Sequence, residues 1–286
     1  MKKYVLLLVI ALGLYACGSV PITGRKQLNL VSDDEVLSLS LQEYDSYIKT
    51  AKKSTDKTAT ALVVKVGQKI ADAVAQYFTV TGQEDLIAGY KWEFNLIDDP
   101  QVNAFCMPGG KIVVYTGILP YTQNETGLAV VLGHEVGHAI AKHANERMSQ
   151  QMALDYGGAA VGALLGKGSA AVQTIGSTVY GLGAQVGVML PFNRKQELEA
   201  DHLGLVLMAI AGYDPNAAIP FWERMSQQGG SNIELLSTHP SDANRIAEIK
   251  KEIPEAMEYY NAIYGKGATP ATTPAKNGNT NSQWSF

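Results

Sequence analysis

One motif constrains this chain more than any other, because residues 134–138 have the pattern H-E-V-G-H. The motif lies in a strongly apolar stretch, residues 128–141, which predicts a buried helix. At about 100° per residue, His134 and His138 lie about 40° apart on such a helix, so both imidazoles can reach one metal ion. Glu135 lies beside them, where it can hold a metal-bound water without being a ligand. Burying three such polar groups without a metal would be costly, so the motif predicts a zinc site.

A catalytic zinc site needs a third protein ligand, and a later helix offers candidates. Residues 194–211 predict a helix that ends before Gly212. Glu197 and Asp201 are four residues apart and share one face of it, whereas Glu199 points elsewhere. This spacing suits one carboxylate ligand and a second carboxylate that orients a ligand histidine. An exposed acidic helix face explains the same segment equally well, so the segment alone leaves both interpretations open.

His143 follows the motif closely but does not fit a ligand position. It lies about 180° around an unbroken helix from His134, so we expect it to point away from the metal. The extended metzincin pattern would need a glycine at 141 and a histidine at 144, and the chain has Ala141 and Ala144 there. We therefore interpret His143 as a packing or hydrogen-bonding residue of the far side of the helix.

The N-terminal residues have the features of an export signal. Two lysines precede a short apolar run, and residues 14–18 read L-Y-A-C-G, which resembles a bacterial lipobox. We therefore predict lipidation of Cys17, although an ordinary signal peptide is the alternative. Lipidation would leave Cys106 without a partner in the chain, which excludes a disulfide scaffold. The predicted organisation is a signal peptide over 1–16, a lipidated tether over 17–31, a zinc metallopeptidase domain over 32–264 and a disordered tail over 265–286.

The remaining pattern is mainly helical with a small sheet, which predicts an α+β fold. Residues 92–96 alternate apolar and polar side chains, and residues 111–116 are a β-branched run, so both predict strands. A Pro-Gly-Gly turn at 108–110 predicts a hairpin here, and we expect the 111–116 strand to offer an edge to an extended substrate. Residues 157–190 are rich in glycine and alanine, which is typical of closely packed helices; a membrane span is the alternative.

Several stretches together resemble one protein family. They are P-I-T-G-R at 21–25, N-A-F at 103–105, P-G-G at 108–110, N-E at 124–125, the H-E-V-G-H run, residues 194–201, A-G-Y-D-P at 211–215 and T-H-P at 238–240. The chain is similar to the M48 peptidase family of gluzincins, which includes the HtpX, CAAX prenyl endopeptidase and BepA-like proteases. It resembles a lipoprotein member without tetratricopeptide repeats.

The resemblance implies a zincin-like catalytic domain with a small sheet beside the H-E-x-x-H helix. It implies one zinc ion per chain held by His134, His138 and Glu197, with Glu135 as general base and Asp201 orienting a ligand. The T-H-P match suggests His239 as a fourth ligand or switch that closes the site until substrate displaces it. Arg245 is our candidate donor to the oxyanion.

We therefore expect a zinc-dependent endopeptidase that hydrolyses unfolded or misassembled cell-envelope proteins. The expected location is the periplasmic face of the outer membrane, reached through the lipid anchor. The net charge of −4 gives no reason to expect nucleic acid as a partner. A chaperone-like module that retains zinc and a structural metal-binding lipoprotein are the rival interpretations. A closed structural site usually has four ligands, often cysteines, and has no use for Glu135.

Overall fold

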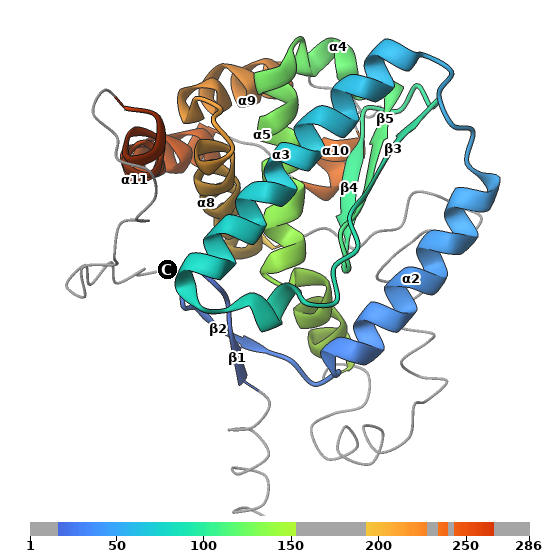
Figure 1. Cartoon of the computed structure of the whole chain (residues 1–286), viewed down its shortest axis with the longest axis vertical. Helices are drawn as coiled ribbons and strands as arrows, with labels where there is room; N and C mark the ends of the chain where they lie inside the picture. The colour runs from blue at the N-terminus through green and yellow to red at the C-terminus, as the bar shows by residue number, and fades with distance from the viewer. Residues whose placement is uncertain (1–16, 153–192, 228–233, 240–242, 266–286) are drawn as a thin grey trace, which may run out of the picture.

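The computed structural model describes residues 17–152, 193–227, 234–239 and 243–265. The predicted signal peptide, the Gly/Ala-rich segment 157–190 and nearly all of the predicted tail lie outside the described residues. Within the described part, helices dominate and a three-stranded sheet lies beside the H-E-x-x-H helix (Figure 1). This arrangement confirms the predicted α+β, mainly helical fold.

Helix α5, Glu125–Ile140, carries the motif and lies at the centre of the molecule (Figure 1). The carboxamide oxygen of Asn124 caps it by accepting a hydrogen bond from the backbone of Gly127. Every residue from Gly127 to Ile140 is buried, because α3 (Lys57–Thr81), α8 (Arg194–Ile210) and the sheet pack around the helix. The apolar character of the predicted helix is therefore the consequence of contacts on all sides.

Helices α5 and α8 approach each other unusually closely, and glycines make this possible. A methyl group added at Gly204 of α8 would lie 2.7 Å from the backbone nitrogen of His134. A methyl group at Gly137 of α5 would lie 2.7 Å from the carbonyl oxygen of Ala200. Both contacts are with backbone atoms, so no rotamer change could relieve them. The glycines thus fix the distance between the H-E-x-x-H helix and the acidic residues of α8.

The sheet has the order β3-β5-β4 and mixed directions. Strand β5, Lys111–Tyr115, pairs parallel with β3, Glu93–Ile97, and antiparallel with β4, Ala104–Met107. The predicted turn joins β4 to β5, with Gly109 and Gly110 at φ 87° and 81°. Strand β5 is therefore central, and the prediction that it offers an edge to substrate is wrong. The edge strand on that side is β4.

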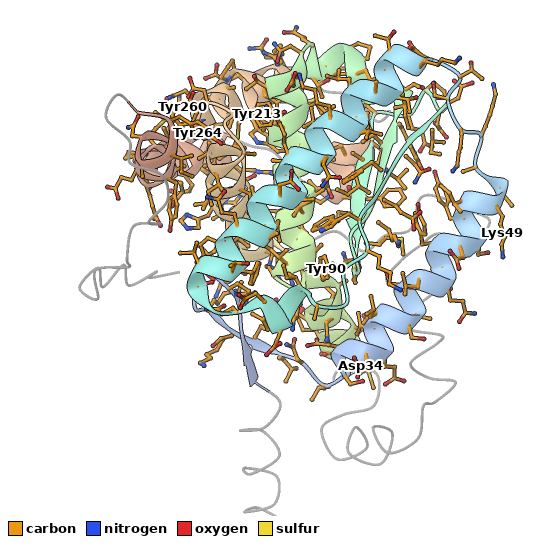
Figure 2. The ribbon with its side chains drawn as sticks, viewed as in Figure 1. Asp34, Lys49, Tyr90, Tyr213, Tyr260 and Tyr264 are labelled. Atoms are coloured by element: carbon orange, nitrogen blue, oxygen red, sulfur yellow. The ribbon has the colours of Figure 1, made fainter. Side chains whose placement is uncertain are left out.

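Both faces of the sheet are covered. Ile112 and Val114 of β5 belong to the main core with α3 and α5, whereas Val113 and Tyr115 pack in a second core under α2, Asp33–Thr50. Helix α2 begins with acidic residues and ends near Lys49, and both Asp34 and Lys49 point to solvent (Figure 2). This charge order favours the helix dipole.

The C-terminal elements pack on α8 and α5, and one of them reaches the segment before β4. They are the short helices η3 (Pro215–Ala217), α9 (Ala218–Gln227) and α10 (Glu234–Thr238), and the long helix α11 (Ala243–Tyr264). Shorter turns, η1 (Glu84–Ile87), η2 (Thr116–Ile118) and α4 (Leu119–Thr122), connect the earlier elements. Among the helices that the structure describes, none has both the length and the apolar character to cross a membrane.

Residues 17–31 do not form the free tether that the sequence predicts. Strands β1, Cys17–Ser19, and β2, Lys26–Leu28, pair antiparallel, and Val20 and Val31 are buried. The turn between the strands, which contains Arg25, reaches α8 and the helical residues 143–152. This hairpin is therefore a packed part of the folded domain, because its apolar and charged side chains find partners there.

Candidate metal centre

Helix α5 presents both motif histidines on one buried face. His134 and His138 are 2% and 4% exposed, and their Nε2 atoms lie 3.1 Å apart. One helical turn separates the two residues, as predicted from the motif spacing. Their facing nitrogens therefore form one side of a common site.

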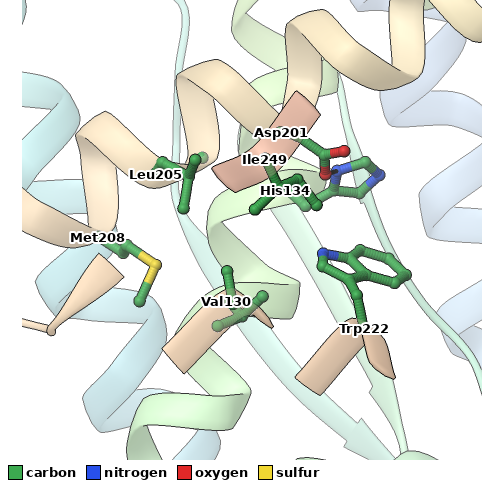
Figure 3. A pocket seen from close by; sticks show the side chains of 9 residues that line it. Val130, His134, Asp201, Leu205, Met208, Trp222 and Ile249 are labelled. Carbon is green, nitrogen blue, oxygen red and sulfur yellow. Dashed lines mark hydrogen bonds and ion pairs between the residues drawn. The ribbon is translucent and has the colours of Figure 1, made fainter. Parts of the chain in front are cut away.

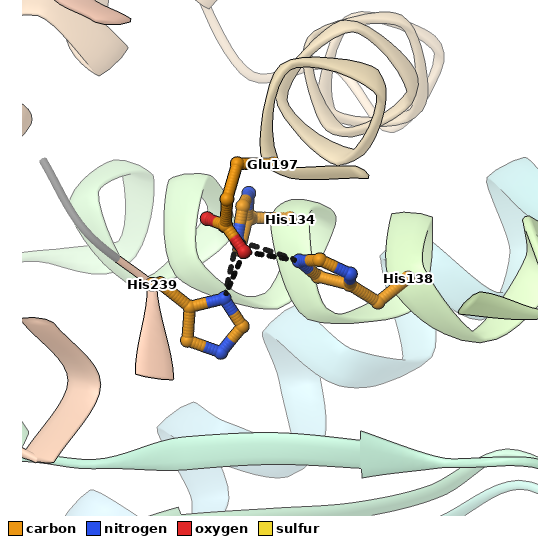
Figure 4. Close-up of side chains that lie close together, drawn as sticks. All are labelled: His134, His138, Glu197 and His239. Carbon is orange, nitrogen blue, oxygen red and sulfur yellow. Dashed lines mark hydrogen bonds and ion pairs between the residues drawn. The ribbon is translucent and has the colours of Figure 1, made fainter. Parts of the chain in front are cut away.

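Helix α8 brings Glu197 to the same point. The capping box of Asn193 and Gln196 begins this helix just before Glu197. The Glu197 carboxylate lies 3.5 Å from Nε2 of His134 and 3.4 Å from Nε2 of His138 (Figure 4). The structure thus excludes the alternative of an exposed acidic face, since Glu197 is only 2% exposed.

His239 reaches the cluster from the residue that follows α10. Its backbone N–H donates to the carbonyl of Leu235, whose own N–H donates to Val102 just before β4. The Nδ1 of His239 lies 2.9 Å from Glu197 and 3.2 Å from Nε2 of His134 (Figure 4). The predicted approach of His239 to the motif therefore agrees with the geometry.

The four side chains fit a zinc ion. Their ligand atoms all lie within 4.8 Å of one another, and the set of three imidazoles and one carboxylate is one that zinc prefers. Ligand atoms of a tetrahedral zinc site are about 3.3 Å apart, because each zinc–ligand bond is about 2.0–2.1 Å long. The spacings between the ligand atoms of His134, His138 and Glu197 are 3.1–3.5 Å. Residues His134, His138 and Glu197, with His239, would hold the ion.

Glu135 is buried beside this cluster and keeps one free oxygen. It is 3% exposed, and its Oε1 has no hydrogen-bond partner among the described residues. The same oxygen lies 3.6 Å from Nε2 of His239. Burial raises the pKa of Glu135 to about 7. A buried carboxylate oxygen without a partner is costly in a purely structural site, so it indicates a group reserved for chemistry.

Asp201 supports His134 from behind. Its Oδ1 lies 2.8 Å from Nδ1 of His134, which leaves Nε2 of that ring to face the cluster. A small apolar cavity lies on this side, and Figure 3 shows the His134 ring between the Asp201 carboxylate and the Trp222 indole. Burial raises the pKa of Asp201, but the charges and hydrogen bonds of Arg245 and His134 together outweigh this and lower it. Asp201 is therefore an ionised hydrogen-bond acceptor for the ligand histidine.

Arg245 of α11, our candidate donor to the oxyanion, lies against Asp201 and Glu197. Its guanidinium donates to both oxygens of Asp201 at 2.7 and 2.8 Å and lies 3.0 Å from Glu197. It also donates to the carbonyl of His239 and stacks on Trp222, 3.8 Å from the ring centre. These contacts occupy N–H donors of the Arg245 guanidinium on the side of Asp201 and Glu197. The structure thus favours a role in orienting Asp201 and Glu197.

The position of His143 differs from the prediction. Helix α5 ends at Ile140, Lys142 adopts a positive φ of 56°, and a new helix follows over 143–152. This break brings the Nδ1 of His143 to 2.8 Å from Nδ1 of His138. Its Nε2 lies 2.9 Å from Glu199. An unbroken helix would have pointed His143 away, as the sequence argument assumed.

Glu199 points away from the cluster, as predicted, but it takes part in a separate set of hydrogen bonds. It accepts hydrogen bonds from His143, Arg25 and Thr23. Burial raises the pKa of Glu199, but these hydrogen bonds outweigh it and lower the pKa to about 2. Sequence reasoning missed this contact of Arg25 and Thr23, although the P-I-T-G-R stretch was a signal of it.

Comparison with known proteins places the chain among metalloendopeptidases. It is 37% identical to the mitochondrial metalloendopeptidase OMA1 of Schizosaccharomyces pombe over 83% of this chain and 67% of that protein. It is 33% identical to the human mitochondrial metalloendopeptidase OMA1 over 83% of this chain and 46% of that protein. The beta-barrel assembly-enhancing protease of Escherichia coli K12 is 31% identical over 56% of this chain and 34% of its own length. The chain thus spans about half or less of the last two relatives.

These relatives contradict the expected location at the periplasmic face of the outer membrane. The proteins that match over more than four fifths of this chain are named as mitochondrial, whereas the bacterial relatives match a shorter part. The lipobox on which the expectation depended ends at Cys17, and the residues before it lie outside the described part of the chain.

The model of Peptidase family M48 matches residues 67–253, which include the whole candidate centre. Metallopeptidases of this family use zinc, and the cluster of His134, His138, Glu197 and His239 can hold it. The chain therefore belongs to peptidase family M48 and is a zinc-dependent metalloendopeptidase.

Proposed function

We propose that His134, His138 and Glu197 are the zinc ligands and that Glu135 is the general base. The observation that carries this proposal is the convergence of these groups at one buried point, where one oxygen of Glu135 has no hydrogen-bond partner within the described part of the chain. Asp201 and Arg245 orient His134 and Glu197 from behind. A structural site has no use for the free Glu135 oxygen, which distinguishes this proposal from a metal-binding structural protein.

The chain's own residues supply the proton transfer. Zinc, when bound, polarises the scissile carbonyl and lowers the pKa of a water toward about 7. Glu135 accepts the proton of the attacking water and passes it to the leaving amine, which it can do because its carboxylate lies beside the cluster. Because the site is buried, electrostatic interactions between its charged groups are stronger than they would be in water.

We propose unfolded or misassembled polypeptides as the substrate class. Strand β4 is one of the two edge strands of the sheet and packs against α5, so an extended segment could pair with it beside the cluster. Backbone pairing reads little side-chain identity, which suits a protease that acts on unfolded chains. This substrate class is proposed from the geometry of the sheet and not from the substrates of the OMA1 or BepA proteases.

His239 is the proposed displaceable group. Its ring occupies the side of the cluster opposite α8, in contact with both Glu197 and Glu135. A neutral imidazole is a good zinc ligand, so His239 would close the site at rest and move aside when substrate enters. The short helix α10 precedes it, and the backbone N–H of Leu235 in that helix donates to the carbonyl of Val102 just before β4.

The decisive experiment compares Glu135→Gln with the wild-type protein on a casein-like unfolded substrate. We expect one zinc per chain in both proteins and loss of hydrolysis in the variant. Glu125→Gln is the matched control, because Glu125 lies on the same helix but binds Lys65 and Tyr213 at the surface. Wild-type cleavage by the Glu135 variant would refute its assignment as general base. A wild-type protein that binds zinc but does not cleave would favour the chaperone-like alternative.

We also propose that a lipid on Cys17 attaches the protein to a membrane. The support is the L-Y-A-C-G sequence at residues 14–18. Lipid labelling of the wild type and of Cys17→Ser tests it, with Cys106→Ser as the control. Equal labelling of wild type and Cys17→Ser would refute the proposal.

A further inference from the structure

His138 is supported differently from His134. The ring of His134 meets a carboxylate directly, at Asp201. The ring of His138 meets another imidazole, with its Nδ1 2.8 Å from Nδ1 of His143 and the ring centres 4.9 Å apart. His143 is fully buried. The two ligand histidines therefore have separate supports.

The hydrogen-bond pattern fixes the proton positions of both rings. A zinc-binding Nε2 on His138 must carry a lone pair, so its proton lies on Nδ1 and is donated to His143. His143 must then accept at Nδ1, which places its own proton on Nε2. That nitrogen lies 2.9 Å from Glu199, and an ionised carboxylate can only accept. These proton positions are consistent with one another, and the series of hydrogen bonds ends at Glu199.

The N-terminal hairpin holds Glu199 in place. Arg25 donates from Nε to Glu199 at 2.8 Å and from its two other nitrogens to Glu146 at 2.8 Å each. Thr23 donates to the second oxygen of Glu199. Glu146 lies in the helix that begins with His143 and also accepts from Gln196 of α8. Arg25 thus joins the helix of His143 to the helix of Glu199.

We propose that Glu199 and His143 are positioning residues that set the tautomer and orientation of the zinc ligand His138, and that Arg25 and Thr23 of the N-terminal hairpin hold Glu199 for this task. The inference rests on His138 being a zinc ligand. Removal of such supporting partners commonly weakens metal binding by about 10–100-fold. The hairpin that precedes the catalytic residues is therefore part of the metal centre.

The test measures zinc affinity by competition with a chelator, together with the visible absorption spectrum of the cobalt-substituted protein. We expect His143→Leu to weaken zinc binding about 10–100-fold and to change the cobalt spectrum. His143→Gln should restore affinity to within a few-fold, because an amide can accept from His138 and donate to Glu199. Arg25→Gln should give a smaller loss than His143→Leu.

His202→Leu is the matched control. His202 is also a buried histidine on a carboxylate, 2.6 Å from Glu252, but that pair includes no residue of the zinc cluster. The inference is overturned if His143→Leu keeps wild-type affinity and spectrum, or if His202→Leu weakens zinc binding equally. If His143→Leu does not fold, Glu199→Met decides, since it keeps nearly the side-chain length and removes both oxygens that can accept from Nε2 of His143. Unchanged zinc affinity in that variant would overturn the inference.

A further variant separates this inference from the proposed function. His138→Ala removes the ligand itself and should abolish stoichiometric zinc. Retained zinc in His138→Ala would refute the ligand assignment, and the inference with it. Lost zinc in His138→Ala together with unchanged binding in His143→Leu would refute only the positioning role.

Discussion

Replacing Gly204 by alanine should weaken the metal centre without altering any ligand. The new methyl group would lie 2.7 Å from the backbone nitrogen of His134, whereas ordinary contacts begin near 3.4 Å. Helices α5 and α8 must therefore separate by about 0.7 Å at this point. Metal–ligand distances tolerate a deviation of only about 0.2 Å. A shift of this size therefore changes the distances between the Glu197 carboxylate and the ligand histidines enough to weaken zinc binding.

The stability effect can be bounded from the same contact. Overpacking against atoms that cannot move costs about 1–3 kcal/mol, which corresponds to a Tm lower by roughly 2–12 °C in a domain of this size. Thermal unfolding with and without zinc measures both effects, and we expect the gain in Tm on zinc binding to shrink in the variant. Gly89→Ala is the control, because its methyl group would meet only the mobile end of Leu37. An unchanged Tm and an unchanged zinc affinity in Gly204→Ala would refute the close-packing argument.

Three further predictions follow from the site and its surroundings. Glu197→Ala should lose zinc and activity together, which metal analysis and a casein-like assay would show; stoichiometric zinc in this variant would contradict its role as a ligand. His239→Ala should keep zinc and raise basal proteolysis, and a structure with His239 far from the metal combined with an unchanged rate would exclude the switch. Burial lowers the pKa of His202, but the hydrogen bond and charge of Glu252, together with the charges of Glu255 and Glu199, outweigh this and raise it. The interaction with Glu252 therefore adds stability at pH values below the usual pKa of histidine and loses it as the pH rises through the raised value. Glu252→Gln should therefore lower the Tm more at pH 6 than at pH 9, and an equal effect at both would contradict the linkage.

The candidate ligands could be predicted because their signals are local. The spacing of His134 and His138 determines their common face on any helix, and the same holds for Glu197 and Asp201. The T-H-P stretch drew attention to His239. These predictions needed only helix geometry and the residue types that zinc prefers.

The supports of the site other than Asp201 could not be predicted, because they depend on contacts between distant segments. Nothing in the sequence at Lys142 indicates a helix break, since lysine favours helices, and so the approach of His143 to His138 was missed. Strand order is also non-local, which is why β5 was placed at an edge. The long side chain of Arg245 could reach several partners, and only the fold selects Asp201 and Glu197.

The position of Arg245 in the first turn of α11 has a consequence for biosynthesis. The centre draws Arg25 from the first hairpin and Arg245 from the last long helix that the structure describes. A chain emerging from the ribosome thus carries the H-E-x-x-H motif long before the guanidinium that steadies Asp201 and Glu197 exists. Such distant contacts form late in folding. The order of synthesis alone therefore delays a fully assembled protease until most of the polypeptide has been made.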